Sequence, residues 1–217
     1  MKFTIKSAEA LPIRGNLEVP RGARALAVLI HGFKGFKDWG FFPWLAEVLC
    51  DEAVAVCRFN MSRSEDTYSG QLDDLEKVVS YCQTHVALPI FLVGYSRGGG
   101  VALLGAADVP NLRGVVTWSA ISHVDGWDEL DDVERRRFDI TGAASRLEVP
   151  LLIVHGARDE SVPVGESAEI AAAAPDASRM IISNASHTYN AVHPLVHVPR
   201  ELMLAADVTA RFICAYS

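Results

Sequence analysis

The stretch Phe91-Leu92-Val93-Gly94-Tyr95-Ser96-Arg97-Gly98-Gly99-Gly100 decides the fold that this sequence predicts. Its apolar start is typical of a buried strand, and the apolar run 101–107 that follows is typical of a buried helix. Between the two, Gly94-Tyr95-Ser96-Arg97-Gly98 fits the pattern G-x-S-x-G. A sharp strand-to-helix turn with this pattern is the setting of a nucleophile elbow, which holds the Ser96 hydroxyl above the sheet. The alternative is a glycine-rich turn with an incidental serine.

The rest of the chain alternates segments typical of strands with segments typical of helices. The apolar run 25–30 indicates a central strand that is buried on both faces. Further strands are expected at 3–6, 13–19, 53–59, 114–118, 150–154 and 180–182, and helices at 44–49, 71–84, 163–174 and 198–215. The first two strands are expected to pair antiparallel. The sequence therefore predicts an α/β fold, with a mostly parallel central sheet of about eight strands and helices on both faces.

Length and composition favour one domain with a substantial core, since the chain has 217 residues and half of them are hydrophobic. We interpret 1–217 as a single domain with a short, lid-like helical insertion at about 120–148, where charged residues are frequent. A net charge of −7 without a basic stripe argues against a nucleic-acid partner. No apolar run is long enough to cross a bilayer, so no membrane association is expected.

The four cysteines form no C-x-x-C pair, since they stand at Cys50, Cys57, Cys82 and Cys214. Irregular spacing of this kind is typical of free thiols in a reducing compartment. The N-terminal residues also lack the apolar core of a signal peptide, so we expect a cytoplasmic location. Neither the cysteines nor the histidines show the spacing of metal ligands, and no metal or other cofactor is expected.

A nucleophilic serine needs a general base, and the base needs a carboxylate that orients it. In parallel sheets such groups gather at the carboxyl ends of strands. Asp159 follows the expected strand 150–154 by a few residues, and its neighbour Glu160 is the alternative. A loop or helix-capping aspartate without a catalytic role would also fit this position. With Ser96 and Asp159 in this order, the base is expected further along the chain.

His187 fits the base best, because it follows the last expected strand. His193 and His197 lie further along and are alternatives, whereas His123 precedes the acid and breaks the order. Two more histidines adjoin glycines at the ends of expected strands, in His31-Gly32 and His155-Gly156. That position favours local hydrogen bonds to the backbone.

The oxyanion that forms during acyl transfer needs preorganised N–H donors. One is expected from the backbone of Arg97, directly after the serine. The second is expected from the backbone of Phe33, in the loop that follows the strand 25–30. The alternative for this loop is a tight turn at the end of a strand.

Four motifs, taken in order, resemble those of the α/β-hydrolase family: His31-Gly32-Phe33, Gly94-Tyr95-Ser96-Arg97-Gly98, His155-Gly156 with Asp159 and Val162-Pro163, and Ser186-His187. The likeness covers nearly the whole chain. Within the family, the chain is similar to the compact branch of dienelactone hydrolase-like and cinnamoyl or feruloyl esterase-like proteins. Dienelactone hydrolases proper carry a cysteine nucleophile, whereas this chain has Ser96. Many esterase relatives have Arg-Gly-x-Gly after the fourth strand, where this chain has Asn60-Met61-Ser62-Arg63-Ser64.

The residues and the resemblance together predict a serine esterase that acts on small to medium carboxylic esters. Ser96 would carry the acyl group, His187 would act as base and then acid, and Asp159 would orient it. The N–H groups of Phe33 and Arg97 would bind the oxyanion. The expected partner is a small-molecule ester substrate. The alternatives are a non-catalytic protein of the same fold that binds a small ligand, and an acyltransferase that uses an acceptor other than water.

The insertion carries apolar residues at spacings of three to five, among them Ile121, Val124 and Trp127. A helix with this pattern would turn its apolar face toward the site and act as a lid that sets substrate size. Trp127 is therefore a candidate substrate-binding residue, and so is Trp118 at the end of a strand. Packing in the core is the alternative for both.

Overall fold

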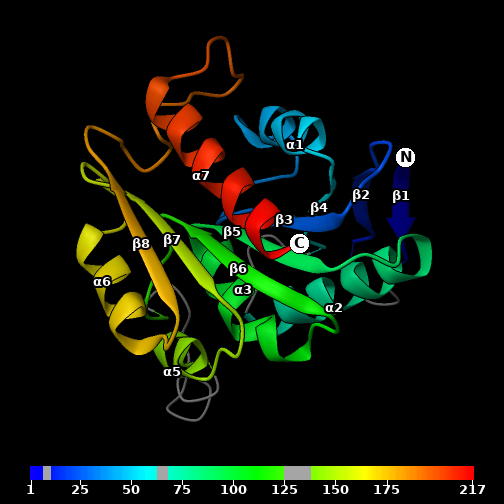
Figure 1. The fold of residues 1–217 in the computed structure, drawn as a ribbon, viewed down its shortest axis with the longest axis horizontal. Helices are drawn as coiled ribbons and strands as arrows, with labels where there is room; N and C mark the ends of the chain where they lie inside the picture. The colour runs from blue at the N-terminus through cyan, green and yellow to red at the C-terminus, as the bar shows by residue number, and fades with distance from the viewer. Residues whose placement is uncertain (7–10, 63–67, 125–137) are drawn as a thin grey trace.

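The computed structural model describes residues 1–6, 11–62, 68–124 and 138–217, and within them eight strands form one sheet in the order β1-β2-β4-β3-β5-β6-β7-β8 (Figure 1). The strands are β1 (Lys2–Ile5), β2 (Ile13–Glu18), β3 (Ala25–Ile30), β4 (Val54–Asn60), β5 (Ile90–Tyr95), β6 (Leu112–Trp118), β7 (Leu151–Gly156) and β8 (Ala177–Ile182). The predicted mostly parallel sheet of about eight strands is thereby confirmed.

The sheet is antiparallel at one edge and parallel elsewhere. β1 pairs with β2, and β2 with β4, in antiparallel register, so that Phe3 lies opposite Gly15. From β4 through β3, β5, β6 and β7 to β8, every pairing is parallel. All residues of β3 and of β7 are buried, because the inner strands of a parallel sheet are covered on both faces. The carboxyl ends of the parallel strands therefore meet at one edge of the sheet.

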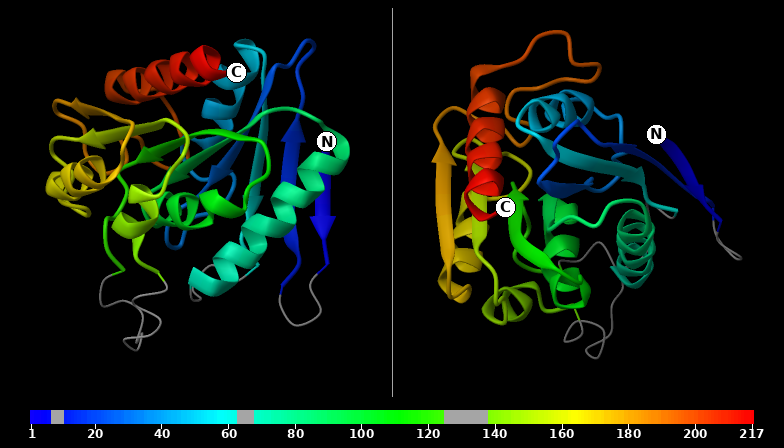
Figure 2. Two further views of the ribbon diagram at one scale, coloured as in Figure 1. Left: turned by 60° about the horizontal axis from the view of Figure 1, so that its bottom comes forward. Right: turned by 45° about the vertical axis from the view of Figure 1, so that its right-hand side comes forward.

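Helices cover both faces of the sheet (Figures 1 and 2). They are α1 (Phe42–Asp51), α2 (Tyr68–His85), α3 (Arg97–Gly105), the short 3-10 helix η1 (Ala106–Asp108), α5 (Ile140–Ser145), α6 (Val164–Ala173) and α7 (Arg200–Tyr216). α1 and α7 lie on one face, and α2, α3, α5 and α6 lie on the other (Figure 1). Strands β1 and β8 lie at opposite edges of the sheet (Figure 2).

Each face of the sheet has its own apolar core, because neighbouring residues of a strand point to opposite faces. Leu92 of β5 belongs to a buried cluster with Leu75 of α2. Its neighbour Val93 belongs to the other buried cluster, together with Leu202 and Ile213 of α7. Burying one such side chain contributes about 1.5–3 kcal/mol relative to exposure. These two cores hold β5, the strand that leads into Ser96, from both sides.

The predicted insertion is described only at its two ends. Its centre, 125–137, lies outside the described residues, and the candidate residue Trp127 lies there too. At the far end, Phe138 is 1% exposed and packs against Tyr68, with 5.6 Å between ring centroids. Asp139 then caps α5, because its Oδ1 accepts a hydrogen bond of 2.8 Å from the N–H of Gly142. This end of the insertion is thus part of the core.

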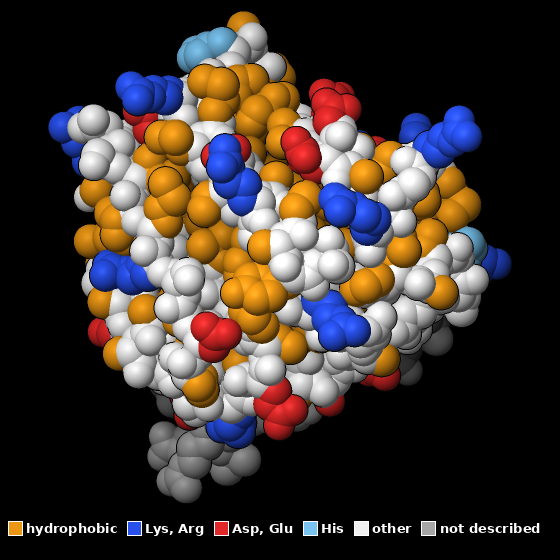
Figure 3. All heavy atoms as spheres, in the orientation of Figure 1, with side chains coloured by type: hydrophobic (Ala, Val, Ile, Leu, Met, Phe, Trp, Pro, Cys, Tyr) orange, Lys and Arg blue, Asp and Glu red, His pale blue; other side chains and the backbone are white. Residues whose placement is uncertain are grey.

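Lys and Arg side chains stand apart from one another on the face seen in Figure 3, with Asp and Glu between them. In the four described ranges, no helix combines the length and the apolar character needed to span a membrane.

The four cysteines, Cys50, Cys57, Cys82 and Cys214, are free thiols, as the sequence predicts.

Candidate active site

Ser96 lies on the turn between β5 and α3, at the carboxyl edge of the sheet. Its backbone has φ 54° and ψ −125°, a strained conformation for a residue with a side chain. A Cβ atom on Gly94 would lie 2.2 Å from the carbonyl oxygen of Gly98, and one on Gly98 would lie 2.3 Å from that of Ile30. Only glycine fits at both positions, so the G-x-S-x-G pattern lets this turn pack directly against β3.

The Asp159 side chain is fully buried in the loop between β7 and α6. Its Oδ1 accepts hydrogen bonds from the N–H groups of Ser161, at 2.9 Å, and Val162, at 2.8 Å. Burial acts to raise the pKa of Asp159, but hydrogen bonds from His155, His187 and Val162 together hold this pKa well below its usual range. The carboxyl group is therefore ionised at neutral pH.

His187 follows β8 and faces this carboxylate. Its Nδ1 lies 2.8 Å from Asp159 Oδ2 and 3.0 Å from Oδ1. An ionised carboxylate only accepts hydrogen bonds, so Nδ1 carries the hydrogen and Nε2 is left as an acceptor. The ring also packs near Tyr95, with 5.1 Å between ring centroids. A histidine in this tautomer can take a proton from a serine hydroxyl through Nε2.

Ser96 and His187 line the same cavity, which encloses about 300 Å³. The other lining residues are Phe33, Tyr68, Arg97, Ile121, His123, Val124, Ser161, Val162 and Glu166. Among the described residues, the hydrogen bonds of His187 go to Asp159. A contact between a base and its serine often tightens only when substrate binds. The cavity thus brings a serine and an oriented histidine together with an apolar wall.

The loop after β3 forms one wall of this cavity. The N–H of Gly35 donates to the carbonyl of Gly32 at 3.0 Å, which closes a turn around Phe33. His31 steadies the turn, since its Nδ1–H donates to the Gly32 carbonyl at 2.9 Å and its Nε2 accepts from the N–H of Met61 at 3.2 Å. Phe33, the expected source of one oxyanion donor, lines the cavity.

Arg97, the expected source of the other donor, is the first residue of α3, where the helix dipole places positive partial charge. Its side chain is directed to α2. The Nε–H donates to Gln71 Oε1 at 3.1 Å, and the guanidinium lies 4.2 Å from the ring centroid of Tyr68. The side chain therefore joins α3 to α2 beside the serine turn.

The alternative acids and bases lie away from this arrangement. His193 Nδ1 accepts a hydrogen bond of 2.9 Å from the N–H of Gly40, and its ring packs against Phe36. His193 and His197 line a separate hollow beside α1. Glu160 is exposed, and it is its neighbour Asp159 that contacts His187.

Trp118, a candidate substrate-binding residue, does not line the cavity and lies in the core instead. It is 1% exposed, and its Nε1–H donates to Thr209 Oγ1 of α7 at 2.9 Å. Its ring packs against Phe41 and Tyr189. The strand end that carries Trp118 directs this side chain to the α7 face of the sheet. Packing, the alternative that the sequence left open, therefore accounts for this residue.

Sequence reasoning did not place Glu166 or His123 in the cavity wall, although both line it. Glu166, in the first turn of α6, accepts a hydrogen bond of 2.7 Å from the N–H of Ser122. His123 Nδ1 lies 2.7 Å from Ser122 Oγ and 3.2 Å from Glu169 Oε2. Of these two, only Glu166 has a sequence signal, because it lies in the first turn of the helix that follows the loop of Asp159. His123 reaches the cavity only through the tertiary fold.

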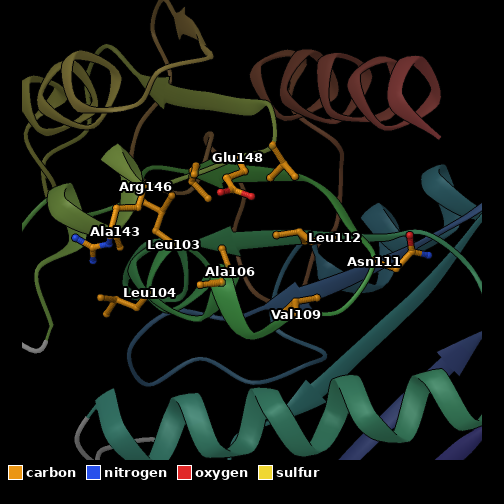
Figure 4. Close-up of a pocket in the computed structure, with 12 residues that line it drawn as sticks. Leu103, Leu104, Ala106, Val109, Asn111, Leu112, Ala143, Arg146 and Glu148 are labelled. Carbon is orange, nitrogen blue, oxygen red and sulfur yellow. The ribbon is translucent and has the colours of Figure 1, made fainter.

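Another hollow, of about 470 Å³, lies at the opposite, amino-terminal edge of β6 and β7 (Figure 4). Leu103, Leu112, Arg146 and Glu148 are among its lining residues, but no serine, cysteine or histidine is. It therefore offers no pair of nucleophile and base. In the described part of the chain, no group of three or more His, Cys, Asp or Glu side chains is placed to hold a metal ion.

The sheet order and the helices on both faces define the α/β-hydrolase class of folds. Est1E from Butyrivibrio proteoclasticus has a similar structure, with a TM-score of 0.80 and 20% sequence identity over 99% of this chain and 98% of that chain. A dienelactone hydrolase from Anabaena variabilis gives a TM-score of 0.79 and 20% identity over 100% of this chain and 97% of that one. These likenesses show the fold.

The family model of the dienelactone hydrolase family matches residues 51–201. The chain therefore belongs to the dienelactone hydrolase family, which confirms the resemblance seen in its motifs. A putative phosphoribosyl transferase from Mycobacterium tuberculosis is 27% identical over an alignment of 168 residues, and this match covers 71% of this chain and 34% of that protein. The chain thus spans about a third of the length of the curated relatives that it matches.

Proposed function

We propose that the protein is a serine hydrolase that cleaves small to medium carboxylic esters through a covalent acyl-Ser96 intermediate. The proposal rests on the 2.8 Å contact between His187 Nδ1 and Asp159 Oδ2, with His187 and Ser96 on the wall of one cavity. A buried, ionised carboxylate that sets the tautomer of a histidine near a serine is the arrangement that activates a hydroxyl group. Membership of the dienelactone hydrolase family supports a hydrolytic reaction.

In the first half of the reaction, His187 Nε2 takes the proton of the Ser96 hydroxyl while Oγ bonds to the ester carbonyl carbon. The N–H groups of Phe33 and Arg97 stabilise the negative charge on the carbonyl oxygen, and the dipole of α3 assists them. The protonated His187 then gives its proton to the leaving alcohol as the C–O bond breaks. Water, activated by the same histidine, hydrolyses the acyl-serine. The reaction requires no metal or organic cofactor.

The cavity favours an apolar acyl group of limited size. Part of its wall is apolar, formed by Phe33, Ile121, Val124 and Val162. Its volume of about 300 Å³ suits a small to medium ester. One structure of Est1E, with a TM-score of 0.79 and 21% identity to this chain, holds ferulic acid. A feruloyl ester therefore belongs among the substrates to be tested. Because dienelactone hydrolases proper use cysteine where this chain has Ser96, we propose open-chain esters rather than dienelactones.

Covalent labelling with a fluorophosphonate, read by intact-protein mass spectrometry, tests the proposal. The unsubstituted protein is expected to acquire one adduct, and Ser96→Ala none. Ser119→Ala is the matched control, because Ser119 is a buried serine that follows the neighbouring strand β6 and does not line the cavity. This control is expected to be labelled normally. A protein that takes up no label, or a labelled Ser96→Ala variant, would contradict the proposal.

A further inference from the structure

A second histidine contacts the same carboxylate as His187. His155 lies at the end of β7 with a fully buried side chain, and its Nε2 is 3.3 Å from Asp159 Oδ2. That oxygen is also the one that His187 Nδ1 contacts at 2.8 Å. Two imidazole rings, from β7 and from the segment after β8, thus converge on one carboxylate oxygen.

The carbonyl of Val162 shows where the hydrogen of His155 lies. Its oxygen is 3.0 Å from His155 Nε2, and a carbonyl only accepts, so Nε2 carries a hydrogen. This N–H donates to Val162 O, and Asp159 Oδ2 lies 3.3 Å from the same nitrogen. His155 Nδ1 is buried and has no hydrogen-bond partner among the described residues. A second N–H at Nδ1 would be buried without an acceptor, which is unfavourable, so the geometry fits the neutral ring.

We propose that His155 is a positioning residue, which holds the Asp159 carboxylate against His187 through its Nε2–H and reduces the negative charge that His187 experiences. The inference rests on the proposed function, because it adds a residue to the same site. His155 does not line the cavity that contains Ser96, so it acts through Asp159 and not on the substrate.

His31 shows that the contact to a carboxylate is not a general property of such histidines. It too is buried, directly after β3, but among the described residues its ring nitrogens hydrogen-bond with the backbone of Gly32 and Met61. The sequence predicts local backbone contacts for His31 and His155 alike. The structure adds the carboxylate contact for His155 alone.

Electrostatics gives the direction in which the loss of the His155 N–H changes the protonation of His187. The His155 Nε2–H carries positive partial charge, and its nitrogen lies 3.3 Å from Asp159 Oδ2, so it opposes a positive charge on His187 next to that oxygen. Without this N–H, protonated His187 is held more strongly and titrates at higher pH. The other titratable or charged groups on this side are Tyr95, which packs against the His187 ring, and Arg97, His123 and Glu166, which line the cavity with it. Glu160, next to Asp159 in the chain, is exposed. A substitution at His155 leaves all of them in place.

Four variants separate positioning from a structural role. His155→Phe removes the donor but keeps a ring. In His155→Gln, the longer amide side chain places an N–H where the Nε2–H of His155 lies. In His155→Asn, the amide side chain is too short to reach Asp159. Tyr189→Phe is the matched control, because the Tyr189 hydroxyl is buried and donates to the carbonyl of Val154, one residue before His155, at 3.0 Å.

The first readout is an NMR titration of the ¹⁵N-labelled His187 ring. In His155→Phe and His155→Asn, its midpoint is expected to rise by about 0.5–1 pH unit. In His155→Gln and Tyr189→Phe, the midpoint is expected to match that of the unsubstituted protein. If His155→Phe does not fold, the comparison of the Asn and Gln variants gives the same test. A midpoint that stays unchanged or falls in the variants without the donor would overturn the proposal.

The second readout is ester hydrolysis. In His155→Phe and His155→Asn, kcat is expected to fall about 10- to 100-fold with KM little changed, and the acid limb of kcat/KM should move to higher pH. His155→Gln should recover most of the rate. A loss of rate with an unmoved acid limb would mean that His155 is only structural. If the unsubstituted protein takes up no fluorophosphonate, the proposed function fails, but the NMR titration still decides the role of His155.

Discussion

The backbone of Gly32 lies so close to Ser96 that a Cβ atom on residue 32 would stand 2.9 Å from Ser96 Cβ and 3.4 Å from Ser96 Oγ. The loop that carries Phe33 and the turn that carries the serine are therefore packed without room for a methyl group. This contact sets the distance between the proposed nucleophile and one of its proposed oxyanion donors.

Gly32→Ala is expected to lower kcat/KM for an activated ester about 100-fold, because the methyl group must push the loop away from Ser96. Steady-state kinetics with a p-nitrophenyl ester measure the loss. Gly70→Ala is the control, since a Cβ atom on Gly70 of α2 meets no heavy atom within 4 Å. Normal kcat/KM in Gly32→Ala would show that the loop can shift without affecting the reaction.

Asp159→Asn is expected to change how stability depends on pH. The pKa of Asp159 is depressed in the folded protein by hydrogen bonds from His155 and His187, against an unfolded value of about 3.9. Its ionised form therefore stabilises the fold above the unfolded value, and this stability is lost as pH falls toward the folded one. The Tm of the native protein should exceed that of Asp159→Asn by a constant, maximal amount above about pH 5, and this difference should shrink toward pH 2. A difference that grows in acid would contradict this sign.

Ile121→Ala is expected to shift the preferred acyl chain of p-nitrophenyl esters toward greater length, because Ile121 lines the cavity with Ser96. The rate of labelling by a small fluorophosphonate should stay within a few-fold, since the reacting groups are untouched. Leu147→Ala, in the hollow of Figure 4, is the control and should leave the ester profile as it is. If both variants gave the native profile, the cavity wall at Ile121 would have no part in selectivity.

Trp118→Phe is expected to lower Tm without altering the ester profile. The substitution removes the hydrogen bond from Trp118 Nε1 to Thr209 Oγ1, which costs about 1–3 kcal/mol of stability when a buried partner is left behind. Thermal unfolding and the ester panel measure the two effects separately. A changed preference for acyl length would return Trp118 to the substrate-binding residues.

The central strands could be predicted almost to the residue, because strands buried on both faces are continuous apolar runs. The apolar run 25–30 is found as β3, with all of its residues buried. The edge strand β8 was harder, since the sequence indicates only 180–182 and the strand spans Ala177–Ile182. Ser178 and Arg179 are exposed there, so they carry no apolar signal.

The start of α3 could not be predicted from helix propensity. The sequence indicates a helix from 101, but α3 begins at Arg97 and has three consecutive glycines, Gly98 to Gly100, directly after it. Close packing requires these glycines, because a Cβ atom on Gly99 would lie 2.4 Å from Ala120 Cβ, and one on Gly100 would lie 2.8 Å from Ile140 Cδ1. Tertiary contacts thus outweigh the low helix propensity of glycine.

The candidate acid and base could be predicted because chain order and strand ends are visible in the sequence. Asp159 and His187 are in contact in the structure, although 28 residues separate them. The polar part of the cavity wall could not be predicted, since His123 and Glu166 are brought together by contacts such as that of Ser122 N–H with Glu166. The contact of His155 with Asp159 depends in the same way on the shape of one loop.

The rate of ester hydrolysis by Ser96→Ala tests the proposed role of Ser96 most directly. With p-nitrophenyl butyrate as substrate, kcat is expected to fall by about 10⁴-fold or more while Tm stays close to that of the native protein. Ser119→Ala, the matched serine control, should keep a kcat within a few-fold of native. Native turnover by pure Ser96→Ala protein would contradict the acyl-serine mechanism.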